Sequence, residues 1–282
     1  MGKHRATSKD NVAGGVLLGA VASGVVGFAA AALGGAGTAS ATCASISGVA
    51  SITTAGSNSD CTSSFGSVAV GLGPGTDATA VGLFNGAVAN GLGNPAGSPA
   101  GTTTALAVGP GLNFAYAGGT NTAATAGGGP LNIAISQGNN SSVAAVGVGN
   151  SAVNIGNGDP TGPNVVSATG AFAMAGNYAS GGPSAPNKVS ANGIGVSAYN
   201  TVGSGNTVTS TGVENTASNI LGNGNTISAS GAFDNIAFNI AGNNNVIAAG
   251  PKGPLAIAGA IGSSNNNGAN SIIQNGPGIK IK

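Results

Sequence analysis

A glycine-led string recurs about every 20 residues along the second half of the chain, and this repeat constrains the fold more than any other feature. The clearest copies are Ala198–Asn206, Ala217–Asn225 and Ala237–Asn245, with a shortened copy at Ala152–Asp159. The glycines that lead the units are Gly118, Gly138, Gly156, Gly176, Gly203, Gly222, Gly242 and Gly262. A unit of this length cannot bury its apolar face alone, so successive units must stack into a solenoid.

Side-chain character alternates within a unit, as in Thr226–Ser230 and Ile236–Ile240. A period of two is typical of a strand with one face buried. Glycine and asparagine separate the alternating runs, and both tolerate the positive φ that tight corners require. The sequence therefore predicts an all-β fold, a single-stranded β-solenoid (β-helix or β-roll) of about 20-residue coils after an N-terminal signal helix.

Stacking is expected to bring equivalent asparagines of successive coils together. The first such set is Asn200, Asn219 and Asn239, and the second is Asn206, Asn225 and Asn245. Their side-chain amides can form hydrogen-bonded ladders along the stack.

One interval between the leading glycines, from Gly176 to Gly203, is longer than the others. Its extra residues are predicted to loop out of one coil. The candidate contact residues of this loop are Pro183, Pro186 and Lys188.

The chain divides into four predicted regions. Residues 1–41 form a signal peptide, and residues 42–63 form a cap that shields the open end of the first coil. Residues 64–117 form an irregular β region of short repeats, interrupted by Pro95 and Pro99. The regular solenoid is expected over residues 118–282.

The N-terminal segment has the layout of a secretory signal. A cationic start with Lys3, Arg5 and Lys9 precedes an uncharged stretch, and an A-x-A cleavage site ends at Ala41, before Thr42. The apolar run, residues 12–33, is longer than a usual signal core, so an uncleaved membrane anchor is the alternative. Membrane contact is expected only through this run. The localisation predicted is secreted or associated with the cell envelope.

Cys43 and Cys61 are the only cysteines, and both follow the predicted cleavage site. In an exported protein such a pair forms a disulfide, which closes the cap. A lipid-modified Cys43 fits less well, because Ser40 and Thr42 stand where a lipoprotein signal has Leu and a small residue. A metal site is weaker still, since no histidine follows residue 41.

Charged residues make up only 5% of the chain, against roughly 25% in an average soluble protein. Beyond residue 41 the chain keeps four lysines and five acidic residues, a net charge of −1. This charge cannot neutralise a phosphate backbone, so a nucleic-acid partner is excluded. The apolar residues are mostly Ala, Val, Ile and Leu, which predicts a thin core of small side chains.

Catalysis is not expected, and neither is a cofactor. General acid–base chemistry needs a positioned titratable pair, and the five acids are scattered. The exception is Glu214 and Asp234, which lie about one coil apart and can stack on one side of the solenoid, as in a carbohydrate-active β-helix enzyme. Thr207, Thr209 and Thr211 alternate as in an ice-binding strand, but they lie in a single coil.

Two resemblances accompany these patterns. The short repeats in Gly66–Gly71 and Ala78–Gly82 make residues 66–93 similar to the head of trimeric autotransporter adhesins. The Gly/Ala/Asn bias and the export signal resemble those of actinobacterial and mycobacterial envelope proteins. These resemblances imply a surface protein and a coiled β head.

The sequence thus predicts an exported, non-catalytic structural or adhesive protein of the cell surface or envelope, presenting a repetitive Asn/Ser/Thr-rich surface. Its expected partners are envelope glycans or further copies of itself. The alternatives are a carbohydrate-active β-helix enzyme using Glu214 and Asp234, and a self-assembling, amyloid-like matrix protein.

Overall fold

The computed structural model describes residues 16–18, 29–31, 42–48, 50–53, 58–95, 98–99, 101–159, 162–179, 185–250, 252–262 and 270–282. It contains two compact units, Met1–Ala39 and Ser40–Lys282. In the first unit, the described residues form strands β1 (Val16–Leu18) and β2 (Ala29–Ala31), which pair antiparallel. The rest of the predicted signal helix and Ala41 of the predicted cleavage site lie outside the described residues.

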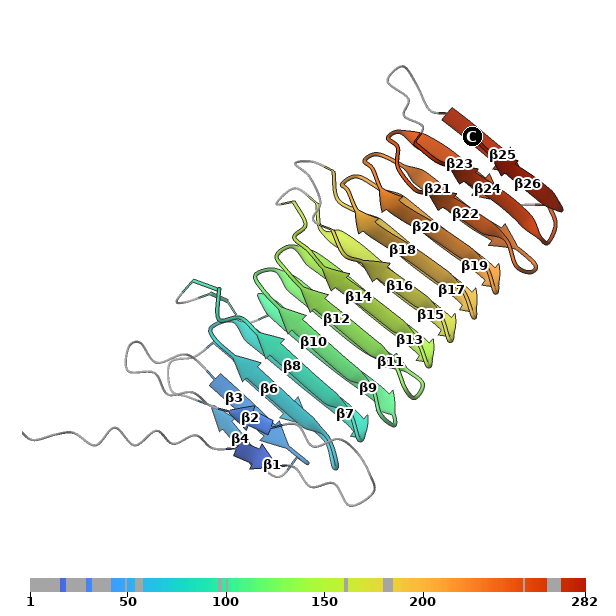
Figure 1. Ribbon diagram of the computed structural model, residues 1–282. Coiled ribbons are helices and arrows are strands. Elements are labelled where there is room, and N and C mark those ends of the chain that lie inside the picture. The colour runs from blue at the N-terminus through green and yellow to red at the C-terminus, as the bar shows by residue number, and fades with distance from the viewer. Residues whose placement is uncertain are drawn as a thin grey trace, which may run out of the picture. The chain divides into compact units, whose positions relative to one another are not determined.

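The second unit is a two-sheet solenoid (Figure 1). The 13-stranded sheet contains, in spatial order, β26 (Gly278–Ile281), β24 (Ala256–Ala260), β22 (Ile236–Asn239), β20 (Thr216–Leu221), β18 (Ser197–Val202), β16 (Met174–Asn177), β14 (Ser151–Ile155), β12 (Ile133–Gln137), β10 (Phe114–Gly118), β8 (Gly86–Asn90), β6 (Val68–Leu72), β3 (Thr42–Ile46) and β4 (Ala50–Thr53). The 11-stranded sheet contains β25 (Asn270–Gln274), β23 (Asn245–Ala249), β21 (Thr226–Gly231), β19 (Thr207–Val213), β17 (Lys188–Ile194), β15 (Asn164–Ala171), β13 (Ser141–Val148), β11 (Thr122–Gly128), β9 (Thr103–Pro110), β7 (Thr76–Leu83) and β5 (Asp60–Ser63).

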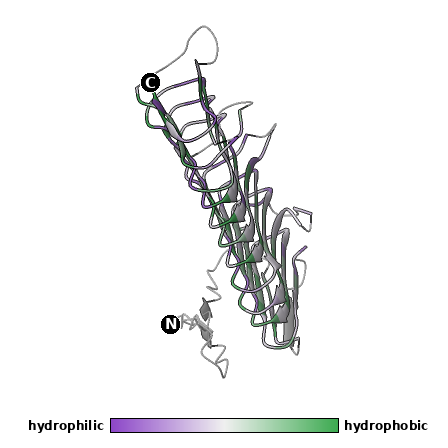
Figure 2. Ribbon diagram, turned by 90° about the vertical axis from the view of Figure 1, so that its right-hand side faces the viewer, coloured by the Kyte–Doolittle hydropathy of each residue, from purple (hydrophilic) through white to green (hydrophobic). Residues whose placement is uncertain are grey.

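Each coil contributes one strand to each sheet, and from β5 onward every strand pairs in parallel with the strand two places along the chain. About ten such coils stack along the solenoid (Figure 2). The described residues contain no helix. The predicted β-solenoid fold is therefore confirmed.

The core is thin because small side chains fill its central column. In the 13-stranded sheet, one inward position is alanine in ten successive coils: Ala69, Ala87, Ala115, Ala134, Ala152, Ala175, Ala198, Ala217, Ala237 and Ala258. The facing column of the 11-stranded sheet carries larger residues toward the C-terminus, from Val143 to Ile227 and Ile272. Methyl groups on one side let the two sheets approach closely, so branched side chains on the other can fill the space.

The glycine phase predicted from the sequence holds at some corners and fails at others. Gly203 and Gly222 lie at equivalent corners of successive coils, whereas Gly176 lies inside β16, where it pairs with Val153 and Tyr199. Gly118 is the last residue of β10, one position before its corner. Gly176 is out of phase because the segment between β14 and β15 is lengthened: equivalent residues of β14 and β16 are 23 positions apart, whereas those of β12 and β14 are 18 apart.

The predicted division at residue 118 has no counterpart in the sheets. Strand β10 pairs with β8 on one side and β12 on the other, and β9 pairs with β7 and β11. The proline-containing segment between β8 and β9 is a loop on one corner. Residues 64–117 and 118–282 therefore belong to one continuous solenoid.

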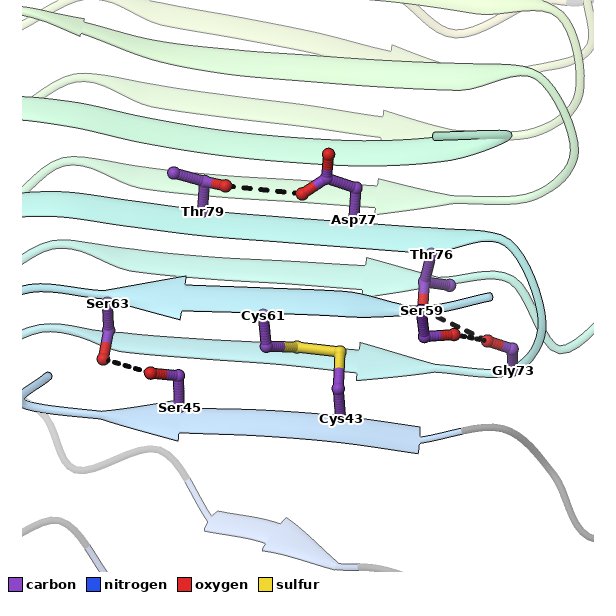
Figure 3. The surroundings of a disulfide bond; sticks show 9 residues. All are labelled: Cys43, Ser45, Ser59, Cys61, Ser63, Gly73, Thr76, Asp77 and Thr79. Atoms are coloured by element: carbon purple, nitrogen blue, oxygen red, sulfur yellow. Dashed lines mark hydrogen bonds between the residues drawn. A yellow bond between two sulfur atoms is a disulfide. The ribbon is translucent and has the colours of Figure 1, made fainter. Parts of the chain in front are cut away.

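A disulfide closes the N-terminal end of the solenoid (Figure 3). Cys43 of β3 and Cys61 of β5 join the two sheets, with their Cα atoms 5.6 Å apart. One layer away, the hydroxyls of Ser45 and Ser63 lie 2.8 Å apart in a buried hydrogen bond. Closing the loop of 18 residues contributes about 3 kcal/mol in the chain-entropy model. Strand β3 also runs antiparallel to β6, which ends the parallel stacking.

The C-terminal coil carries polar side chains at positions that are alanine in the coil before it. Gln274 pairs with Ala249, and Lys280 pairs with Ala258. Lys280 is exposed. A charged side chain at an inward position of the last coil discourages another coil from stacking there.

Candidate interaction faces

The predicted asparagine ladders are present inside the solenoid. In the first ladder, the side-chain amide of each asparagine donates to the carbonyl oxygen of the preceding one, at distances of 2.7–2.8 Å. This ladder contains Asn154, Asn177, Asn200, Asn219 and Asn239. All five side chains are buried.

The second ladder follows the neighbouring corner and uses the main chain. The backbone N–H of each residue donates to the Oδ1 atom of the asparagine one coil earlier, at 2.9–3.0 Å. Its members are Asn164, Asn187, Asn206, Asn225 and Asn245. Cross-links such as Asn225 Nδ2 to Asn219 Oδ1, at 3.2 Å, join the two ladders.

A third ladder at the opposite corner was not predicted from the sequence. It comprises Asn85, Asn113, Asn132 and Asn150, and a second run of Asn215 and Asn235. Each follows a residue with positive φ, among them Phe84, Leu112 and Glu214. The signal that could have revealed this ladder is an asparagine three or four residues after a glycine near the end of a strand, such as Gly82, Gly109, Gly147 or Gly212.

These ladders hold coils together, and their burial removes them from any binding surface. Asn200, Asn219, Asn239, Asn206, Asn225 and Asn245 are each 0% exposed. These six asparagines therefore do not belong to the repetitive surface, whereas Asn139, Asn192 and Asn223 are exposed. The outer surface is made by the side chains that alternate with the inward ones.

The outer side of the 11-stranded sheet carries regular columns of hydroxyl groups over β15 to β21. In register, Ser190 lies beside Thr209 and Thr209 beside Ser228, while Thr211 lies beside Ser230. We call this surface the hydroxyl face; it comprises Ser167, Thr169, Ser190, Thr207, Thr209, Thr211, Thr226, Ser228 and Ser230. Columns along the stack have a spacing of about 4.8 Å, and alternate residues on a strand lie about 6.6 Å apart.

The hydroxyl face spans several coils and includes the alternating threonines of β19. The sequence indicated only Thr207, Thr209 and Thr211 of a single strand. Serines at the equivalent positions of the neighbouring coils were not recognised as part of the same columns, because the coil boundaries were needed to align them.

The outer side of the 13-stranded sheet is apolar. We call the outward side chains of β8 to β24, and of the residues that directly follow these strands, the apolar face; its larger members are Val88, Phe114, Tyr116, Ile133, Ile135, Val153, Ile155, Met174, Tyr178, Tyr199, Ile220, Ile236, Phe238, Ile240, Ile257 and Ile261. Many are strongly exposed, Ile155 at 46% and Ile220 at 42% among them. Sequence reasoning missed this face, because a strand that is apolar on both sides is normally buried on both sides.

Glu214 and Asp234 lie at equivalent corners of successive coils, after β19 and β21. The asparagines that follow them, Asn215 and Asn235, are hydrogen-bonded to each other in the third ladder. Both carboxylates are exposed, and both residues have positive φ, 55° and 51°. The structure thus stacks the two acids on one side of the solenoid, on its outer edge.

The predicted contact loop is described only at its C-terminal end. Pro183 lies outside the described residues, whereas Pro186 is half-buried. The carbonyl of Ala185 accepts a hydrogen bond of 2.9 Å from the backbone N–H of Gly205, which ties the loop to the next coil. Lys188 is exposed at the start of β17 and pairs with Thr207, so it borders the hydroxyl face.

Asp77 carries the one carboxyl among the described residues whose pKa is clearly displaced. Partial burial and the charge of Asp60, its register partner on β5, raise the pKa of Asp77 above its usual value of 3.8. A hydrogen bond of 3.3 Å donated by the Thr79 hydroxyl opposes the rise (Figure 3). The folded protein therefore disfavours the ionised form of the Asp77 carboxyl.

We expect Asp77→Asn to raise the melting temperature slightly at neutral pH. Since the folded pKa of Asp77 is raised, the native state binds its proton more tightly than the unfolded chain does. The free energy of unfolding should therefore rise as pH falls through the folded pKa toward 3.8, and the substitution should remove this rise. Melting curves of the wild type and Asp77→Asn at a series of acidic pH values measure this change. A difference in melting temperature that stays constant with pH would contradict the raised pKa of Asp77.

Comparisons with known proteins found no matching family model, no matching curated protein and no matching solved structure. Within the described ranges, no helix is long and apolar enough to span a membrane. The same part of the chain contains no group of three or more His, Cys, Asp or Glu residues placed to hold a metal ion.

Proposed function

We propose that this chain is an exported, non-catalytic structural or adhesive protein of the cell surface or envelope, and that its hydroxyl face binds envelope glycans. The observation that carries the proposal is the register of Ser190, Thr209 and Ser228, which line up across three coils. The cationic start and the A-x-A site of the sequence support export, and the Cys43–Cys61 disulfide is consistent with an oxidising compartment.

Hydroxyl columns suit a glycan because each Ser or Thr hydroxyl can both donate and accept a hydrogen bond. A polysaccharide repeats its own hydroxyls along its length, so one chain can meet several columns at once. Each hydrogen bond contributes only about 0.5–1.5 kcal/mol, but several made by one rigid surface add up. Thr207, Thr209 and Thr211 are held by a strand whose inward residues are buried, so little side-chain ordering is required on binding.

Retention of the purified chain from residue 42 onward on insoluble envelope polysaccharide tests the proposal. The triple variant S190A/T209V/S228A should lose affinity by about tenfold, which corresponds to about 1.4 kcal/mol. The matched control S197A/T216V/S218A removes the same set of hydroxyls from the outward positions of β18 and β20. We expect this control to bind as the wild type does; equal losses in both variants, or none, would contradict the proposal.

The stacked carboxylates favour one second candidate, a carbohydrate-active enzyme. Glu214 and Asp234 lie on successive coils and are both solvent-accessible. Sugar release from the same polysaccharides, abolished in the E214Q/D234N variant, would support that reading against the adhesive one. For the amyloid-like alternative, the antiparallel cap and Lys280 count against growth at either end.

A further inference from the structure

The apolar face is uncharged and mostly apolar over most of the solenoid. From β8 to β24, the outward positions that the structure describes contain no Asp, Glu, Lys or Arg. The polar exceptions are the hydroxyls of Ser151, Ser197, Thr201, Thr216 and Ser218, and the amides of Asn90 and Gln137. The outer side of the other sheet, in contrast, carries the charged side chains Asp60, Asp77 and Lys188.

Aromatic rings make this face flat, because they cover glycines of neighbouring strands. A Cβ atom added to Gly176 would lie 2.9 Å from Cδ1 of Tyr199, which shows that the Tyr199 ring rests against that glycine. The Phe238 ring covers Gly259 in the same way, two strands further along the sheet. Rings that lie across the sheet leave a flat surface, and a flat apolar surface is matched by another flat apolar surface.

The face is large enough for a stable protein interface. Its nine strands lie about 4.8 Å apart and contribute about five residues each, which gives an area of about 700 Å². Pairing two such faces would bury about 1,400 Å² in total, within the range of specific interfaces. Monomeric proteins rarely expose contiguous apolar patches larger than a few hundred Å², and the larger side chains of this face are mostly apolar.

We propose that the apolar face is the interface with a second copy of this chain, packed sheet against sheet in a two-fold dimer. Only a flat, uncharged partner of similar length can cover the whole face, and the same face of another copy has all three properties. The expected packing is that of aligned sheets, with strand directions about 30° apart. In this dimer both hydroxyl faces point outward, although the inference does not depend on what they bind.

The mass of the chain from residue 42 onward, which is one compact unit, tests the proposal by sedimentation and light scattering over a dilution series. We expect twice the single-chain mass for the wild type. The I155K/I220K variant should have the single-chain mass, because it places charges within the buried face at positions already exposed in one copy. The control S190K/T209K adds the same charge to the hydroxyl face and should remain dimeric.

Circular dichroism and melting temperature must match among the three proteins, so that loss of the dimer is not loss of the fold. A wild-type chain that stays monomeric at every concentration would overturn the proposal. So would a dimer that survives I155K/I220K. A monomer that cosediments with neutral phosphatidylcholine vesicles would instead assign the apolar face to a lipid surface and overturn the dimer.

Discussion

Replacing Gly193 with alanine is expected to lower the free energy of unfolding by at least about 4 kcal/mol. Losses this large are exceptional for a single substitution. Gly193 has a φ of 147°, and a Cβ atom there would overlap the carbonyl oxygen of Gly212 in the next coil. Neither atom can move aside, because both belong to strands fixed by ladders on each side. Equilibrium denaturation of the chain from residue 42 onward measures the loss.

Gly195 provides the matched control for this prediction. It lies two residues away and also has positive φ, 64°, but its added Cβ would meet only Cγ of Glu214, at 3.5 Å. Gly195→Ala should therefore cost about 1–2 kcal/mol, the strain of the left-handed conformation alone. Equal losses at the two positions would show that backbone conformation, and not the close approach of coils, determines where glycine is required.

Replacing Asn219 with alanine is expected to destabilise the protein by about 3 kcal/mol, because it interrupts the first ladder between Asn200 and Asn239. The Asn219 amide donates to Asn200 Oδ1 at 2.8 Å, and its carbonyl accepts from Asn239 Nδ2 at 2.8 Å and from Asn225 Nδ2 at 3.2 Å. All these groups are buried, and water cannot replace the lost partner without entering the core.

Asn192→Ala is the control for the ladder, since Asn192 lies outward and exposed on β17. We expect it to change the free energy of unfolding by less than about 0.5 kcal/mol. Denaturant titrations of both variants separate a general effect of asparagine from an effect of the ladder. A loss for Asn219→Ala no larger than that for Asn192→Ala would mean that the ladder contributes little to stability.

The repeat unit, the strand alternation and two of the three ladders could be predicted from the sequence, because each depends on residues a fixed distance apart. Asn200, Asn219 and Asn239 share one phase, and stacking follows from it. Gly176 shows the limit of this argument. Gly176 has the expected spacing from Gly156, but the extra residues between β14 and β15 move the corner further along the chain, so Gly176 lies within a strand.

The two outer faces could not be predicted in the same way. Which residues point outward depends on where each strand begins, and one residue of error exchanges the two sides of a strand. Ser190, Thr209 and Ser228 become neighbours only once the register of β17, β19 and β21 is known. Composition suggested Asn as a surface residue, yet stacking also lets its amide form hydrogen bonds within the core, as Asn200, Asn219 and Asn239 do in successive coils.

The claim that the hydroxyl face binds glycans is tested most directly by a fluorescent label placed either on that face or away from it. The two native cysteines form a disulfide, so a single added thiol is the unique labelling site. An environment-sensitive dye at T209C, on β19, should change its emission when a soluble fragment of envelope polysaccharide is added. The same dye at N275C, an exposed residue after β25 that belongs to neither face, should not. A response at Asn275 alone, or at neither position while the fragment binds, would contradict the account.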